Sequence, residues 1–415
     1  MESLFNNEFE SLKSYIKNHT TDMIELQKIL TAHPALAPEN GGDGEWEKCA
    51  ALEKWLIENG IKNLEHYDAP DERVSAKKRP NLIATIPGNR DDHTIWVCAH
   101  LDVVPTGDLL AWHSDPWTVT EKDGKLYGRG VEDNQQGLVS GVLAALSFVK
   151  QHILPEYTIK LLFMADEEVG SRYGMIWLIE NHSELFSKND LILIPDGGDP
   201  KGETIEIAEK NIAWFKFHTI GKQCHGSRPD QGKNAFLAAS ELALLVHDMK
   251  NVFNKKDPLF EPDCSTFEPT MKYHNVDGVN MIPGDDVFCA DCRILPCYTL
   301  DQVREELKKR VNQVEDKYGV KIEIEELQAA QSHATSENAP VVKKLKDAIK
   351  SVHNIDAKCI GIGGGTVGAE LRNKGYDCVV WSTMDETCHQ PDEYCKIENI
   401  GKDALTIAFM AINAM

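Results

Sequence analysis

The sequence has no long hydrophobic run and no excess of positive charge. No apolar segment approaches the roughly 20 residues that a membrane-spanning helix needs, and no basic region followed by an apolar core opens the chain. The 44 lysines and arginines are outnumbered by 66 aspartates and glutamates, so the formal net charge is -22. This charge repels phosphate backbones and anionic lipids. We therefore expect a cytoplasmic protein that binds small molecules or other proteins, and neither nucleic acid nor a membrane.

The cysteines form no compact disulfide framework. Their number, eleven, is odd, and they are scattered along the chain, which indicates reduced thiols in a reducing compartment. Cys289 and Cys292 have CxxC spacing, which could instead form a zinc knuckle or a redox pair. The segment around them, DDVFCADCRIL, is typical of a strand, and in a strand side chains three positions apart face opposite sides. We therefore predict that these two cysteines are structural.

Four short apolar segments predict buried parallel strands, because they are rich in β-branched residues and nearly continuous. Helical patterns lie between and around them, at residues 46–58, 135–151, 339–353 and 396–413. This alternation predicts an α/β fold with a doubly wound, mostly parallel sheet. The four strand segments are TIWVCAHL (94–101), YTIKLLFMA (157–165), DLILIP (190–195) and DCVVWST (377–383).

Residues 210–328 follow a different order. Their apolar patterns succeed one another as β-α-β-β-α-β, the ferredoxin-like α+β arrangement. A chain of 415 residues is also too long for one typical core. We therefore predict a discontinuous α/β domain of residues 1–209 and 329–415, with a smaller α+β domain of residues 210–328 inserted into it.

Polar side chains follow the carboxyl ends of all four predicted strands, where open α/β sheets bind their ligands. Taken singly, each candidate has a plain structural explanation. His100 could be a core histidine, and Asp133 a helix cap. Asp196 could be a turn former and His389 a loop residue. Their convergence on one edge of the sheet is what indicates a site.

The segment ADEEVG places three acids at the end of a predicted strand. Glu167 and Glu168 cannot both be buried as unpaired anions. A metal ion would balance one of them, and the other, held near an activated water, could act as general base. Asp196 and His389 would complete an oxygen and nitrogen ligand set suited to zinc. For Asp166 we expect only a local hydrogen bond in the turn.

These residues resemble a known family in motif order over nearly the whole chain. The family is the cocatalytic dizinc amidohydrolases, which include acetylornithine deacetylase, succinyl-diaminopimelate desuccinylase, carboxypeptidase G and several dipeptidases. HLDVVP and GRGVEDNQQG are similar to its first two metal motifs. The resemblance implies two zinc ions bridged by Asp133 and by a hydroxide, with cobalt or manganese as alternatives. It also implies Glu167 as general acid/base and Asp102 as the carboxylate that orients His100. The implied ligands are His100 and Glu168 on one ion, and Asp196 and His389 on the other.

The inserted domain resembles the family's lid and dimerisation domain, which implies a homodimer. CHGSRPDQGKNAF matches the motif whose histidine, here His225, stabilises the tetrahedral oxyanion across the dimer. GVNMIPGDDVFCADCRI matches the lid segment in which Asn280 and Arg293 would hold a substrate carboxylate. The implied backbone contacts to that carboxylate, in GIGGGTVGAE, are Gly364, Gly365 and Thr366.

The expected function is hydrolysis of the amide bond of an N-acyl amino acid, as in acetylornithine deacetylase and succinyl-diaminopimelate desuccinylase. A metal-dependent dipeptidase or aminopeptidase would use the same residues and is the main alternative. A non-catalytic metal-binding protein is a third possibility. The chain departs from many relatives at Gln136 and Asn211, which weakens the transfer of any one member's substrate specificity.

Overall fold

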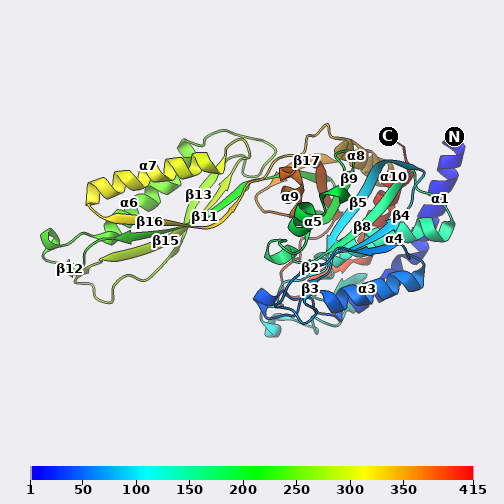
Figure 1. Ribbon diagram of the computed structural model, residues 1–415, viewed down its shortest axis with the longest axis horizontal. Helices are drawn as coiled ribbons and strands as arrows, with labels where there is room; N and C mark the ends of the chain where they lie inside the picture. Colours follow the sequence, from blue (N-terminus) through cyan, green and yellow to red (C-terminus); the bar gives the residue numbers. More distant parts are fainter. Residues whose placement is uncertain (1, 415) are drawn as a thin grey trace. The chain divides into compact units, whose positions relative to one another are not determined.

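The chain forms two compact units in the computed structural model, which describes residues 2–414. Unit 1 runs to Ile207 and continues with Thr335–Ile360 and from Thr366 onward. Unit 2 consists of Ala208–Ala334 and Gly361–Gly365. The fold class agrees with the prediction, because Figure 1 shows a mixed α/β unit and an inserted α+β unit.

The segment Gly361–Gly365 was predicted to lie in the larger domain and belongs to unit 2 instead. Two hydrogen bonds explain this correction. The Lys210 backbone N–H donates to the Ile362 carbonyl at 2.9 Å, and Nη1 of Arg293 donates to the Gly363 carbonyl at 2.7 Å. The main segment of unit 2 begins at Ala208 and ends at Ala334, where the predicted bounds are 210 and 328.

The central sheet of unit 1 has eight strands in the described residues. The four predicted strands form its middle: β8, β5, β9 and β18 are neighbours and run parallel. The outer pairs β1–β4, β4–β8 and β10–β18 are antiparallel. In spatial order the strands are β1 (Leu64–His66), β4 (Leu82–Ile86), β8 (Tyr157–Met164), β5 (Arg90–His100), β9 (Leu191–Asp199), β18 (Cys378–Thr383), β10 (Thr204–Glu209) and β17 (Lys358–Ile362).

Helices cover both faces of this sheet, as a doubly wound fold requires. On one face lie α4 (Gln135–Gln151) and α10 (Ile397–Ile412), which pack against each other and against the central strands. On the other face α5 (Met175–Asn181) and α9 (Val367–Asn373) share one apolar core with Trp96 of β5. Further elements of unit 1 are α1 (Glu2–His19), α2 (Met23–Thr31), α3 (Trp46–Asn59), α8 (Pro340–His353), β2 (Ala69–Pro70), β3 (Lys78–Arg79), β6 (Thr120–Lys122), β7 (Lys125–Tyr127) and β19 (Tyr394–Lys396).

Unit 2 has the predicted β-α-β-β-α-β order around an antiparallel sheet in the spatial order β13-β15-β11-β16. Phe217, Phe288 and Cys292 pack in one apolar cluster of this unit, whereas Cys289 is buried outside that cluster. Both cysteines are free thiols in strand β15, three positions apart, so their side chains face opposite sides of the strand. The elements are β11 (Asn211–Ile220), β12 (Cys224–His225), α6 (Ala235–Asp248), β13 (Thr266–Lys272), β14 (Met281–Ile282), β15 (Asp285–Ile294), α7 (Leu300–Tyr318) and β16 (Lys321–Ala330).

The parallel order brings the carboxyl ends of the middle strands to one edge of the sheet. His100 ends β5, and the ADEE segment follows β8. Asp196 lies in the last part of β9, and the loop that contains His389 follows β18. No described helix is both long enough and apolar enough to cross a bilayer.

Candidate metal centre

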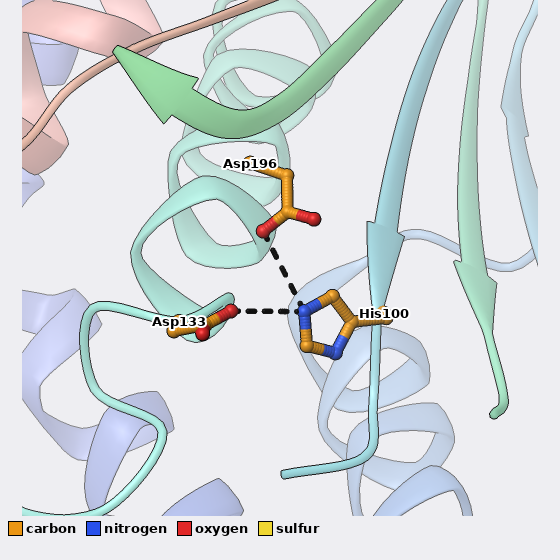
Figure 2. A group of neighbouring side chains, drawn as sticks. All are labelled: His100, Asp133 and Asp196. Carbon is orange, nitrogen blue, oxygen red and sulfur yellow. Dashed lines mark hydrogen bonds and ion pairs between the residues drawn. The ribbon is translucent and has the colours of Figure 1, made fainter. Parts of the chain in front are cut away.

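His100 is the last residue of β5, and its ring faces two carboxylates. Its Nε2 atom is 3.0 Å from Oδ1 of Asp133 and 3.5 Å from Oδ1 of Asp196. Figure 2 shows the three side chains converging from different segments of the fold. Only 1% of the His100 side chain is exposed. One nitrogen and two carboxylate oxygens, all within 4.8 Å of one another, could hold a metal ion.

A second group shares Asp133 with the first. Nε2 of His389 is 3.0 Å from Oδ2 of Asp133 and 3.1 Å from Oε2 of Glu168. These three ligand atoms also lie within 4.8 Å of one another. Oδ1 of Asp133 therefore faces His100 and Oδ2 faces His389, an arrangement in which one carboxylate can bridge two ions.

This grouping corrects the ligand assignment implied by the resemblance. Glu168 was expected beside His100, and Asp196 beside His389, but the structure exchanges them. The sheet order is the reason. β9 runs parallel to β5 as its direct neighbour, which brings Asp196 to His100. Glu168 follows β8, on the opposite side of β5, and its side chain extends to the loop of His389.

The close contacts shift the pKa values of the site residues. Hydrogen bonds to Asp133 and Glu168 raise the pKa of His389 to about 10. Burial opposes the charged form of His100, but Asp196 and other nearby carboxylates raise its pKa well above the usual range. Although burial alone would raise it, the pKa of Asp133 is lowered by hydrogen bonds from the two histidines. Without a metal ion, histidine protons therefore balance part of the carboxylate charge.

Divalent cations fit this set of donors. Oε1 of Glu168 is buried and has no hydrogen-bond partner among the described residues, which is costly for a carboxylate oxygen. A cation would remove that cost. Three carboxylates and two imidazoles form a mixed oxygen and nitrogen set, which suits zinc and related divalent ions.

Asp102 connects His100 to the turn that contains the candidate base. Its two carboxylate oxygens accept hydrogen bonds from the backbone N–H groups of Glu167 and Glu168, both at 3.0 Å. Nδ1 of His100 is 2.9 Å from the backbone oxygen of Asp102 and 3.4 Å from Oδ1. A proton on Nδ1 that is held in this way leaves Nε2 free to bind a metal.

The carboxylate of Glu167 differs from its neighbours because no described residue donates a hydrogen bond to it. Burial and the nearby charge of Asp196 raise the pKa of Glu167 well above its usual range. A carboxylate that is held by its backbone but free at its oxygens can accept and return a proton.

Two supporting residues, Asn134 and Arg79, were missing from the sequence-based prediction. Asn134 follows Asp133 directly, and its Nδ2 donates to Oδ1 of Asp196 at 2.8 Å. Asp166 accepts a hydrogen bond from the Tyr173 backbone at 3.0 Å, which confirms the local role predicted for it. Asp166 also lies 3.2 Å from Nη1 of Arg79. Arg79 is a fully buried cation, and no sequence motif indicated its contact with Asp166.

Three of the remaining predicted site residues belong to unit 2. His225 and Asn280 are exposed residues of unit 2 and lie close together, because the Gly226 backbone N–H donates to the Asn280 carbonyl at 2.7 Å. Arg293 is also in unit 2, where its guanidinium is paired with Asp291 at 2.7 Å. Their approach to a substrate stays a prediction.

The glycine loop is divided between the units. Gly364 and Gly365 belong to unit 2, whereas Thr366 belongs to unit 1. Oγ1 of Thr366 accepts a hydrogen bond from the Gly368 backbone at 3.0 Å and so caps the start of α9. The contacts of this loop to a substrate carboxylate stay a prediction.

Comparison with known proteins identifies the family. The sequence profile described as peptidase family M20/M25/M40 matches residues 96–413. An uncharacterized metallohydrolase of Methanocaldococcus jannaschii is 42% identical, over 92% of this chain and 97% of its own. The succinyl-diaminopimelate desuccinylase of Polynucleobacter necessarius is 27% identical, over 77% of this chain and 82% of its own.

A solved structure agrees with this at the level of the fold. The aminopeptidase PepT of Bacillus cereus superposes with a TM-score of 0.75 at 19% identity, over 94% of this chain and 98% of that chain. The profile match spans the metal groups described above. The chain therefore belongs to the peptidase family M20/M25/M40 and is a metal-dependent hydrolase that acts on amide bonds.

Proposed function

We propose that this protein hydrolyses the amide bond of an N-acyl amino acid with the aid of two divalent metal ions, most simply zinc. The observation that carries the proposal is the shared position of Asp133 between two histidines, next to the unengaged carboxylate of Glu167. A relative named as a desuccinylase, aligned over 77% of this chain, supports an acyl amino acid as the substrate class.

His100, Asp133 and Asp196 would hold one ion, and Asp133, Glu168 and His389 the other. Such ions supply Lewis acidity, which polarises the scissile carbonyl and makes water acidic enough to attack it near neutral pH. The exposed fraction of the ligand side chains rises from 1% at His100 to 56% at His389. Substrate would therefore approach from the side of His389.

Glu167 is the proposed proton carrier. Its carboxylate would take the proton of the attacking water and pass it to the amine nitrogen as the carbon–nitrogen bond breaks. Asp102 would keep this group in place, because it binds the Glu167 backbone and contacts the His100 ring. The tetrahedral oxyanion that forms needs a separate donor, the role proposed for His225.

A second copy of the chain is proposed to complete the substrate site. His225 and Asn280 lie beside the start of β15, since β12 pairs with β14 and Ile220 pairs with Asp285. Arg293 lies eight residues further along the same strand, which is about 27 Å in an extended chain. One small substrate cannot touch both ends, so the His225 end would serve the site of a partner subunit.

Unit 2 also has a surface that suits such a partner. Phe236, Leu237 and Leu244 of α6 are exposed by 48%, 52% and 72%. α6 packs on β13, an edge strand of the sheet, and an open edge with an apolar helix beside it favours pairing with another copy. We propose that α6 and β13 form the homodimer interface.

A substrate panel tests the proposed activity. Metal-free protein would be reloaded with zinc, cobalt or manganese and assayed on N-succinyl and N-acetyl amino acids and on dipeptides. We expect the acylated amino acids to be hydrolysed faster than the dipeptides. Hydrolysis of dipeptides alone would refute the deacylase assignment in favour of a dipeptidase or aminopeptidase, while the metal-site assignment would be unaffected.

A further inference from the structure

Two buried glutamates outside the ligand set connect the loops that contain Asp133 and His389. Glu132 directly precedes Asp133, and Glu393 lies four residues after His389. Their exposed fractions are 2% and 0%. Buried carboxylates are stable only where several donors satisfy them, so the donors identify what each glutamate holds.

The hydrogen bonds to the Glu393 carboxylate all come from the loop that contains Asp133, here called the first loop; the loop that contains His389 is the second loop. Its Oε1 accepts hydrogen bonds from the backbone N–H groups of Glu132 and Asp133, at 2.9 and 3.0 Å. Its Oε2 accepts from the Gly130 backbone at 3.0 Å and from the Arg129 guanidinium at 2.6 Å. A side chain from the end of the second loop thus fixes the backbone on which Asp133 stands.

Glu132 forms the reciprocal set of bonds with the second loop. Its Oε1 accepts a hydrogen bond from the Asp385 backbone at 2.7 Å. Its Oε2 accepts from the Thr387 backbone N–H and from the Thr387 hydroxyl at 2.6 Å. Each loop therefore buries a carboxylate in the backbone of the other, and a metal-ligand candidate stands close to each contact.

The second loop needs such support because its backbone is unusual. Glu386, His389 and Asp392 have φ angles of 58°, 62° and 56°, a left-handed conformation that non-glycine residues rarely adopt. Surrounding contacts must hold residues in this region. The His389 ring is also the most exposed of the ligand candidates, at 56%, so side-chain packing contributes little to its position.

We propose that Glu132 and Glu393 are positioning residues that set the separation between Asp133 and His389, and so determine the affinity of the metal site formed by Asp133, Glu168 and His389. The proposal rests on the proposed two-metal function. The other site is positioned differently, because His100 and Asp196 stand on the paired strands β5 and β9 and Asn134 contacts them both. Loss of the reciprocal contacts should therefore affect the two sites unequally.

The test measures metal affinity and needs no substrate. Metal-free wild-type and Glu132→Gln proteins would be titrated with zinc against a chelating indicator, and with cobalt while the visible absorption spectrum is recorded. Replacing the carboxylate puts an amide NH₂ against backbone donors. We expect the affinity for one metal equivalent to fall about 10- to 100-fold, the range typical when a supporting residue around a metal site is lost, while the affinity for the other equivalent changes much less.

Asp190→Asn is the matched control. Asp190 is also a buried carboxylate, exposed by 6%, and it accepts hydrogen bonds from the Ser187 backbone, the Thr94 backbone and the Trp96 indole. It precedes β9, at the opposite edge of the sheet from the metal groups. This variant should lose stability but retain both metal affinities.

Equal weakening of both sites in Glu132→Gln, or unchanged affinity at both, would overturn the proposal. Thr387→Val removes one donor to Glu132 without burying a new polar group, and should show the same selective loss on a smaller scale if Glu132→Gln does not fold. A wild-type protein that binds two ions but hydrolyses no acyl amino acid would refute the proposed substrate and leave this inference standing.

Discussion

Glu167 and Glu168 are adjacent in the sequence, yet their side chains have different surroundings. Oε2 of Glu168 faces His389 at 3.1 Å, whereas no described residue donates to the Glu167 carboxylate. Asp166, the third acid, lies against Arg79 at 3.2 Å. The mutual repulsion that the ADEEVG segment would suffer in isolation is thus relieved by three separate environments.

The raised pKa values of the histidines predict proton release on metal uptake. Because the pKa of His389 is about 10 without metal, the ring carries a proton at pH 8, and coordination requires the unprotonated ring. Metal uptake at pH 8 should release about two protons, one from each histidine, and metal affinity should increase with pH toward 10. Calorimetric titrations in buffers of different ionisation enthalpy measure this number.

The control is the same titration with His389→Asn protein. The number of protons released on metal uptake should fall by about one in this variant. An enthalpy of zinc binding that is equal in all buffers would show that both rings are already neutral. That result would contradict the balance of charge between protonated histidines and carboxylates in the metal-free site.

The five metal-ligand candidates could be predicted from the sequence because each follows a strand segment or a motif. Their grouping could not. Whether Glu168 or Asp196 lies beside His100 depends on which strand neighbours β5 on each side, and strand order is a long-range property that local patterns do not contain. Glu132 and Glu393 escaped prediction for a similar reason, since their partners are more than 250 residues away in the chain.

At the level of elements, the contact between α4 and β9 positions two ligand candidates at once. α4 begins at Gln135, two residues after Asp133, and β9 contains Asp196. A Cβ atom on Gly137 would lie 2.4 Å from the Pro195 carbonyl oxygen, so only glycine allows this close approach. The spacing of Asp133 and Asp196 therefore depends on one residue without a side chain.

Gly137→Ala should consequently destabilise the protein by about 1–3 kcal/mol, the usual cost of overpacking, and weaken metal binding. Gly141→Ala is the control on the same helix. Its Cβ would meet a side-chain methyl of Val97 at 3.1 Å, which can shift, and alanine favours a helix by up to about 1 kcal/mol. Denaturant unfolding of the metal-free variants compares them, and equal stability would refute the requirement for glycine at position 137.

The four central strands could be predicted because their apolar runs are short and continuous. β5, β8, β9 and β18 all occur where such runs stand, and all are parallel. The transfer of Gly361–Gly365 to unit 2 was not predictable. The Lys210 backbone and the Arg293 side chain donate hydrogen bonds to backbone carbonyls of this region. Every residue has a backbone carbonyl, so no local sequence pattern indicates these bonds.

For the whole molecule, we predict that activity requires a dimer. Leu244→Glu places a charge on the α6 surface and should convert the dimer to a monomer that keeps both metal ions and loses most of its turnover. Leu154→Glu is the control, because Leu154 lies in unit 1 and has a similar exposed fraction of 62%, against 72% for Leu244. Sedimentation velocity measures the change, and a fully active wild-type monomer would contradict the role assigned to a partner subunit.

The most direct test of the central claim is the turnover of Glu167→Gln protein at full metal loading, on the best substrate of the panel. The variant keeps the size of the side chain and every metal ligand, so it should bind two ions per chain. Its turnover should fall by about 10²- to 10⁴-fold, the contribution typical of a positioned general base. Turnover equal to that of the wild type, with both ions bound, would contradict the assignment of Glu167 and the mechanism built on it.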